Sequence, residues 1–257
     1  MIEKADAIIL NSKKYRETSK ILTLYTKEFG KLNMVAKGSR TKNNKFGGSL
    51  ETLSHVSVVF YHYPQKEYQY ITQSNINNYY KNIHSDINKT MTAMSISEIV
   101  YNTMHLYDPN HSIFDLLVDT FDALEVEEKD FLKYLVYFQI HYAQLLGYMP
   151  NFSSCTLCGV GIESDYMYDS IYFNINSGSL LCGECSKKTI VPLRKSSYGS
   201  GKIINKFHSV NVTKLKSISV SLPLINEVFS IFHLYLKNHV PGMKDLKSLN
   251  LLFSMTI

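Results

Sequence analysis

The chain has 257 residues, of which 45% are apolar, and this is enough to build one large core or a few small ones. No eighteen uncharged apolar residues follow one another and no apolar signal segment follows Met1, so we expect a soluble, unexported chain without a membrane-spanning helix. Four cysteines are too few for a disulfide scaffold, and their arrangement in two pairs favours a cytosolic metal site.

The formal net charge is +5, but the charges are unevenly distributed. Residues 1–80 hold twelve Lys and Arg against six Asp and Glu, residues 81–150 hold four against ten, and residues 151–257 hold eleven against six. A basic first third beside an acidic middle predicts a polyanion-binding surface joined to a part with a different task.

The first eighty residues carry the pattern of short strands. Apolar and β-branched runs occupy residues 5–10, 21–26, 32–36, 55–61 and 68–72. Gly30-Lys31 and Pro64-Gln65-Lys66 mark turns at hairpin spacing. Five short strands without a strong helix predict a small barrel of the OB type, with a propeller blade or an open meander as alternatives.

From about residue 81 the apolar spacing changes to three and four, which predicts amphipathic helices. These helices are expected over residues 94–104, 114–124, 132–145 and 224–236. Ser112 and Asp130 are the predicted N-caps of the second and third helices, and Gly147 is the predicted stop of the third. Residues 196–201 have the composition of a flexible link.

These changes of pattern predict an α+β multidomain protein. Residues 1–80 are expected to form an OB-fold nucleic-acid-binding domain, and residues 81–150 with 190–257 an α-helical domain. Residues 151–189, which contain the cysteines, are expected to form a zinc ribbon inserted into the helical domain.

The cysteines carry the most specific chemical motif. Cys155 and Cys158 form one C-x2-C pair, and Cys182 and Cys185 form a second pair after twenty-three intervening residues. Two such turns can place four thiolates around one Zn²⁺, although tetrathiolate sites also accept iron. Four protein ligands leave no open position for water, so we expect a structural ion and not a catalytic one. A redox dithiol needs only one such pair.

A basic, glycine-punctuated loop covers residues 37–48. It contains four positive charges and no negative one, at Lys37, Arg40, Lys42 and Lys45. Lys and Arg on such a loop can follow a phosphate backbone while aromatic side chains of the barrel stack on bases. The tyrosines available for stacking are Tyr15, Tyr25, Tyr61, Tyr63 and Tyr70, with plain packing as the alternative role.

Motifs of common enzymes are absent from the sequence. Gly199 and Gly201 precede Lys202, but Ser196 and Ile203 replace two residues that a phosphate-binding loop requires. No His-Glu-x-x-His and no zinc-deaminase motif occurs, and the nine histidines are scattered singly. We therefore expect no catalytic residue and a protein that is not an enzyme, with a nuclease or another zinc enzyme as an alternative.

Several segments share a pattern with a known family. They are Ala-Ile-Ile-Leu at 7–10, Lys-Tyr-Arg-Glu-Thr-Ser-Lys-Ile-Leu at 14–22, Tyr-Thr-Lys-Glu-Phe-Gly-Lys at 25–31, Ala-Lys-Gly-Ser-Arg at 36–40, Leu-Gly-Tyr-Met-Pro at 146–150, and Phe173 with Ser177-Gly178. In these segments and in the order of its elements, most of the chain resembles the RecO family of bacterial recombination mediators and DNA repair proteins.

The resemblance implies an N-terminal OB-fold that binds single- and double-stranded DNA. It also implies strand annealing and, together with RecR, the loading of RecA onto DNA coated by single-strand-binding protein, whose C-terminal tail would be a direct partner. Some members of the family lack the cysteines, so the resemblance implies that the one Zn²⁺ expected here is structural and dispensable to the core activity. We expect a cytoplasmic, nucleoid-associated protein that has no membrane partner.

Carried over by position, the resemblance assigns DNA contacts to two groups of residues. The first group is Lys37, Arg40, Lys42 and Lys45, and the second is Tyr15, Arg16 and Lys20. Asn43 and Asn44 dilute a basic run that is denser in much of the family. Lys214 and Lys216 are candidates for the rim of a tail-binding groove, with a solvated helix face as the alternative.

A different class of function remains open for these residues. A basic barrel with a zinc ribbon also suits an RNA-binding or ribosome-associated interaction protein. Affinity for RNA and for single-stranded DNA of the same sequence would separate the two, since a protein that reads the 2′-hydroxyl discriminates between them.

Overall fold

The computed structural model describes residues 1–163 and 170–249. They form two compact units. The first unit comprises Met1–Val126 with a short piece that begins at Leu246, and the second comprises Glu127–Asp245.

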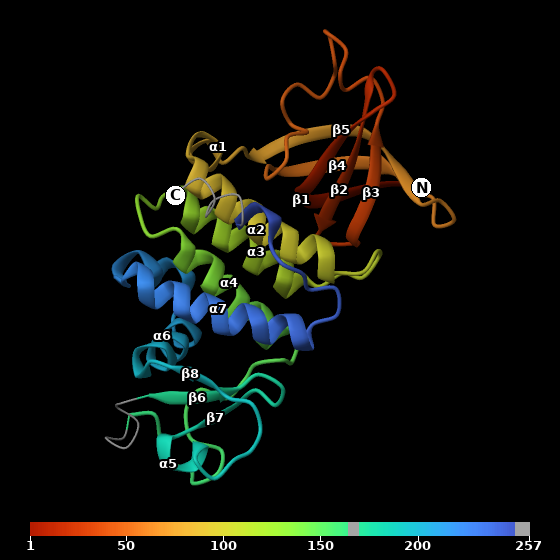
Figure 1. The fold of residues 1–257 in the computed structure, drawn as a ribbon. Coiled ribbons are helices and arrows are strands. Elements are labelled where there is room, and N and C mark those ends of the chain that lie inside the picture. The colour runs from red at the N-terminus through yellow and green to blue at the C-terminus, as the bar shows by residue number, and fades with distance from the viewer. Residues whose placement is uncertain (164–169, 250–257) are drawn as a thin grey trace. The chain divides into compact units, whose positions relative to one another are not determined.

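The first unit contains a closed barrel of five strands (Figure 1). The strands are β1 (Ile2–Tyr15), β2 (Ser19–Thr26), β3 (Gly30–Ala36), β4 (His55–Tyr61) and β5 (Tyr68–Asn78). Their order is β1-β2-β3-β5-β4, with β3 and β5 parallel and the other pairs antiparallel. A register shift between Ile9 and Asn11 lets the long β1 bend and pair with both β2 and β4. The predicted OB-like barrel is therefore confirmed.

The barrel interior follows the two-residue alternation of its strands. Ala5, Ala7 and Ile9 of β1 point inward and are almost completely buried. Larger side chains fill the remaining space, namely Leu22, Leu24, Leu32, Met34, Val56, Val58 and Phe60. Small residues on one strand facing large ones on the others give a filled core that fixes the register, so the outward positions are fixed as well.

Three helices also belong to the first unit: α1 (Lys81–Ser85), α2 (Ile87–Thr103) and α3 (His111–Glu125). The Asp86 carboxylate accepts two backbone N–H groups at the start of α2. Asn110 caps α3, because its Oδ1 accepts the N–H of Ile113 at 3.1 Å. The predicted cap at Ser112 is wrong, since this residue already lies in the first turn of the helix.

The second unit contains α4 (Leu132–Leu145), α6 (Tyr198–Ser209), the 3-10 helix η2 (Val212–Ser217) and α7 (Leu222–His239). Gly147, with φ of 78°, follows the end of α4 as predicted. The predicted cap at Asp130 is wrong, because Phe131 occupies the cap position and makes no side-chain cap bond. The predicted link at 196–201 is also wrong, since Ser197 caps α6.

A buried ion pair lies at the start of this unit. Lys133 Nζ is 3.0 Å from Glu127 Oε2, and the hydroxyl of Tyr134 donates to the same oxygen at 2.7 Å. Burial opposes ionisation of Glu127, but hydrogen bonds from Tyr134, the Glu128 backbone and Lys133 outweigh it and hold the pKa of Glu127 below its ordinary value. Loss of either charged partner would leave an uncompensated buried charge.

A small sheet lies between α4 and α6 in the sequence. It consists of β6 (Ile171–Asn174), β7 (Ser179–Leu181) and β8 (Arg194–Ser196) in the order β7-β6-β8, and the one-turn helix α5 (Gly183–Ser186) follows β7. Phe173 of β6 stacks on Phe152 at 4.6 Å between ring centroids and meets Tyr235 of α7. The predicted fold class, a barrel followed by a helical domain with an inserted cysteine ribbon, is confirmed.

Candidate nucleic-acid interface and metal centre

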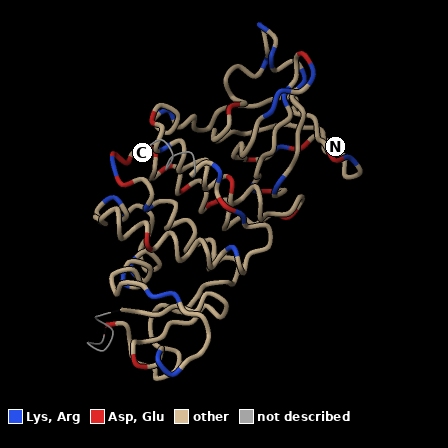
Figure 2. Tube along the Cα trace, in the orientation of Figure 1, with Lys and Arg blue, Asp and Glu red and all other residues tan. Residues whose placement is uncertain are grey.

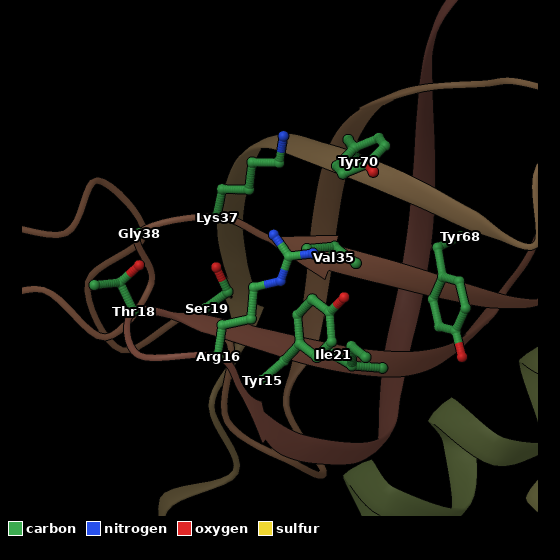
Figure 3. A pocket seen from close by; sticks show the side chains of 10 residues that line it. All are labelled: Tyr15, Arg16, Thr18, Ser19, Ile21, Val35, Lys37, Gly38, Tyr68 and Tyr70. Atoms are coloured by element: carbon green, nitrogen blue, oxygen red, sulfur yellow. The ribbon is translucent and has the colours of Figure 1, made fainter.

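A depression on the outer face of the barrel brings aromatic and basic side chains together (Figure 3). It has a volume of about 490 Å³ and lies over the β1–β2 turn, β2, β3, β5 and the start of the loop that follows β3. We call it the tyrosine pocket, and its lining residues are Tyr15, Arg16, Thr18, Ser19, Ile21, Val35, Lys37, Gly38, Tyr68 and Tyr70.

Strand alternation and register place the tyrosines at this pocket. Tyr68 and Tyr70 of β5 point outward, because Gln69 between them is buried. The parallel pairing of β5 with β3 sets Tyr70 beside Val35, and Tyr15 stands at the opposite end where β1 turns into β2. Tyrosines that are far apart in the sequence therefore surround one depression.

Arg16 and Lys37 supply positive charge to the tyrosine pocket. Lys37 Nζ lies 4.6 Å from the ring centroid of Tyr70, and Arg16 Cζ lies 5.2 Å from that of Tyr15, both within the range of cation–π contacts. Within the described part of the chain, neither side chain forms an ion pair with an acid. Two uncompensated cations beside one cavity suit an anionic group such as a phosphate.

Arg40, a predicted phosphate contact, holds the β1–β2 turn. Its Nη1 donates to the carbonyl oxygens of Arg16 at 3.1 Å and Glu17 at 3.0 Å, and its backbone N–H donates to Thr18 at 2.9 Å. Arg16 has φ of 51°, an uncommon conformation for a residue with a side chain. The contacts of Arg40 therefore support the turn that carries Tyr15 and Arg16 to the pocket.

The other predicted basic residues occupy different surroundings. Lys20 Nζ lies 3.0 Å from Glu51 Oε1 and donates to the carbonyl of Leu50 at 3.4 Å, so its charge is compensated locally. Lys42 and Lys45 are exposed on the loop between β3 and β4 and do not line the pocket. Lys and Arg are nevertheless frequent around this end of the barrel (Figure 2).

Among the tyrosines, the sequence reasoning missed one residue and misplaced another. Tyr25 is fully buried and lies 6.5 Å from Phe114 between ring centroids, so the expectation that it can stack on a base is wrong. Tyr68 was overlooked, although its two-residue spacing from Tyr70 within a predicted strand was a usable signal, since it places both side chains on one face. A hydrogen bond with Glu67 and the charge of that carboxylate raise the pKa of Tyr68 above its ordinary value.

The four cysteines form a second cluster, in the second unit. The sulfur atoms of Cys155, Cys158, Cys182 and Cys185 all lie within 4.8 Å of one another, and the Cys158 and Cys182 sulfurs are 3.8 Å apart. Tetrahedral thiolate ligands at the usual zinc–sulfur distance are about 3.8 Å apart, so this donor set fits one metal ion. The four cysteines can therefore hold a metal ion.

Two tight turns build the cluster. In the first, the N–H of Gly159 donates to the carbonyl of Cys155 at 2.9 Å, and Gly159 has φ of 74°, which favours a residue without a side chain. In the second, Cys182 caps α5 and its sulfur accepts the N–H of Cys185 at 3.4 Å. Each turn thus orients its two sulfurs through local backbone contacts.

The protonation of the cysteines depends on their neighbours. Burial opposes ionisation of Cys155, but N–H donation from Cys158, Cys182 and Leu157 outweighs it and lowers the pKa of Cys155 to about 6. Burial and hydrogen bonds with the other cysteines raise the pKa of Cys185 to about 12. Four thiolates this close repel one another, and a divalent cation at their centre removes that repulsion.

Together, these features define a class: OB-like barrel proteins, whose barrels commonly bind oligonucleotides, with an added helical domain and a tetracysteine ribbon. Residues 1–80 match the family model described as Recombination protein O N terminal, and residues 84–250 match Recombination protein O C terminal. The chain therefore belongs to the recombination protein O (RecO) family, as the sequence motifs indicated.

Individual relatives agree with this assignment. The chain is 29% identical over 239 residues to the DNA repair protein RecO of Thermoanaerobacter sp. (strain X514), which covers 92% of each chain. It is 32% identical over 180 residues to the protein of the same name from Desulfatibacillum aliphaticivorans, covering 70% of this chain and 69% of the relative. The protein of that name from Chloroherpeton thalassium is 25% identical over 251 residues, 96% of each chain.

Membership in this family supports a role in DNA repair and recombination, and hence DNA binding. Among the helices in the described residues, none has the length and apolar character needed to cross a bilayer.

Proposed function

We propose that this protein is a non-catalytic mediator of DNA repair and homologous recombination that binds single- and double-stranded DNA and anneals complementary strands. The observation that carries the proposal is the tyrosine pocket, where two cations and three tyrosines meet on the outer face of an OB-like barrel. Family membership supports the same role. No covalent chemistry is required, and no catalytic residue is assigned.

Arg16 and Lys37 are the first proposed phosphate contacts, because both line the pocket and neither forms an ion pair with an acid among the described residues. Lys42 and Lys45 are proposed to follow the backbone further along the exposed loop, and Tyr15 to stack on a base. Arg40 and Lys20 remain proposed contacts, but each would have to share its charge with the partners it already has.

Annealing would follow from charge neutralisation. Each Lys or Arg on a phosphate releases counterions and lowers the repulsion between two strands, so complementary bases can meet. Binding of the acidic tail of single-strand-binding protein would keep the mediator at coated DNA, with Lys214 and Lys216 as candidate contacts, since both are exposed on η2. Joint action with RecR would then give RecA access to the strand. We place this activity in the cytoplasm, at the nucleoid.

One Zn²⁺ is the proposed occupant of the cysteine cluster. Cys155, Cys158, Cys182 and Cys185 would hold it, and the ion would supply the positive charge that keeps all four thiolates deprotonated. With every position filled by protein, its role would be to stabilise the ribbon.

The deciding experiment is an annealing assay with labelled complementary strands, one of them coated with the cognate single-strand-binding protein, across a salt series. Acceleration on the coated strand that fades with salt is expected. Binding to naked strands without annealing of coated ones would contradict the mediator role. Tighter binding to RNA than to single-stranded DNA of the same sequence would instead favour the RNA-binding alternative.

A further inference from the structure

We propose that the tyrosine pocket receives one unstacked nucleobase together with its phosphate, and that this gives the barrel a preference for single strands over duplexes. The inference rests on the proposed DNA binding and names the part of the DNA that the pocket recognises. It assigns Tyr68 and Tyr70, which line the pocket on β5, as residues that determine specificity.

The shape and lining of the pocket suit a flat apolar ring. Ile21 and Val35 contribute aliphatic side chains, and the rings of Tyr15, Tyr68 and Tyr70 stand around them (Figure 3). The volume of about 490 Å³ lies within the range of pockets that bind small organic molecules. Every base has a π-face that can stack on a tyrosine, so this surface would accept any base.

The positive charges around the pocket indicate that its ligand also carries a negative charge. Arg16 and Lys37 lie at the same cavity, and the described residues around it include no acid that pairs with either one. An aromatic cage for a cationic ligand needs the opposite charge, so trimethyl-lysine or choline would be repelled. An aromatic ring that carries an anion satisfies both features, and a nucleotide unit of a DNA strand is such a ligand.

A paired base cannot use this pocket. In a duplex, both faces of each base are covered by its neighbours and its edge is hydrogen-bonded, so entry requires unstacking and unpairing at a cost of a few kcal/mol. A single strand presents its bases without the pairing cost. The phosphate contacts serve both forms of DNA, whereas the tyrosine contacts serve only the single strand.

The test is a titration of the full chain with three probes of equal length, about 16 nucleotides. The probes are a single strand, the corresponding duplex, and an abasic strand that keeps the phosphates without the bases. Tyr70→Ala and Tyr68→Ala are each expected to weaken single-strand binding by about 5- to 150-fold, the range that base stacking on one aromatic side chain supplies, with little change for the duplex. Tyr70→Phe and Tyr68→Phe keep the ring and are expected to bind as the unaltered chain does.

Tyr79→Ala is the matched control, because Tyr79 is an exposed tyrosine of the same unit that stacks on His84 outside the pocket. The abasic strand tests the inference on the unaltered protein, which should bind it no better than the duplex. Equal affinity for the abasic and the normal strand, or equal losses for single strand and duplex in the tyrosine variants, would overturn the inference. If the unaltered chain binds none of the probes, the proposed function itself fails.

Discussion

The cysteine cluster and the tyrosine pocket are assembled by different routes. Each turn of the cluster orients two sulfurs through bonds within a few residues of chain, and only two such turns have to meet. The pocket draws on the β1–β2 turn, β2, β3 and β5, so its parts come together only when the barrel has closed. A site built from local motifs can be recognised from sequence spacing, whereas a site built from strand register cannot. The two sites should also respond differently to perturbation.

Metal removal is expected to have the largest effect and to separate the two sites. Structural zinc sites of this kind contribute on the order of 10 kcal/mol to folding, so a chelator should unfold the ribbon around Cys155 and Cys182. DNA binding by the barrel should persist. Hydrogen exchange read segment by segment, with metal content measured on the same sample, would check both statements. If the barrel lost its protection from hydrogen exchange together with the ribbon, the two sites would not be independent of each other, contrary to this prediction.

The buried pair Glu127–Lys133 tests whether the metal alone supports the second unit. Lys133→Met should destabilise it by about 3–5 kcal/mol even with metal bound, because Glu127 would be left charged and buried. Urea unfolding monitored in this unit would measure the loss.

The same pair gives a pH dependence. The pKa of Glu127 is lower in the folded state than the ordinary value of 4.5. Its contribution to stability is therefore complete above that value and is lost as pH falls through the folded pKa. Glu127→Gln should show a weaker decline in stability at acidic pH than the unaltered chain. An identical acid profile for the two proteins would show that this carboxylate does not contribute.

Neutralising the basic surface of the barrel should change the salt dependence of DNA binding. Arg16, Lys37, Lys42 and Lys45 replaced together by Ala should flatten the slope of log affinity against log salt by about three to four units on duplex DNA. A control with four exposed lysines of the second unit replaced, Lys188, Lys195, Lys206 and Lys244, should change the slope much less. Equal slopes for the two variants would show that the basic loop does not contact DNA.

Substitution of Arg40 is expected to have the smallest effect, but it distinguishes a residue that supports the β1–β2 turn from one that contacts phosphate. If its main role is to hold the carbonyls of Arg16 and Glu17, Arg40→Lys should lower single-strand affinity as much as Arg40→Ala, because Lys lacks the guanidinium fork. The expected loss of stability is about 1 kcal/mol, measured by thermal unfolding. Full rescue of DNA affinity by Lys would instead identify Arg40 as a simple phosphate contact.

Much of this architecture was accessible from local patterns. Short runs of apolar and β-branched residues between turn signals predicted the five strands, and the three-to-four spacing predicted α2, α3, α4 and α7. Helix caps were less predictable, because Asn110 and Ser112 are both acceptable cap residues and packing decides where α3 begins. The basic loop was recognised as a group, but its members differ in their partners, as Lys20 and Lys37 illustrate.

By itself, the sequence determined the metal motif and the class of fold, because cysteine spacing and apolar periodicity act within a few residues. Tertiary structure decided which tyrosines face a common cavity, that Tyr25 is buried, and that Arg40 supports a turn. These outcomes depend on the closure of the barrel and on the register between β3 and β5. In the sequence, these two strands are separated by a long loop and by β4. The packing of the whole core sets this pairing, so the pairing cannot be deduced from a single segment of the sequence.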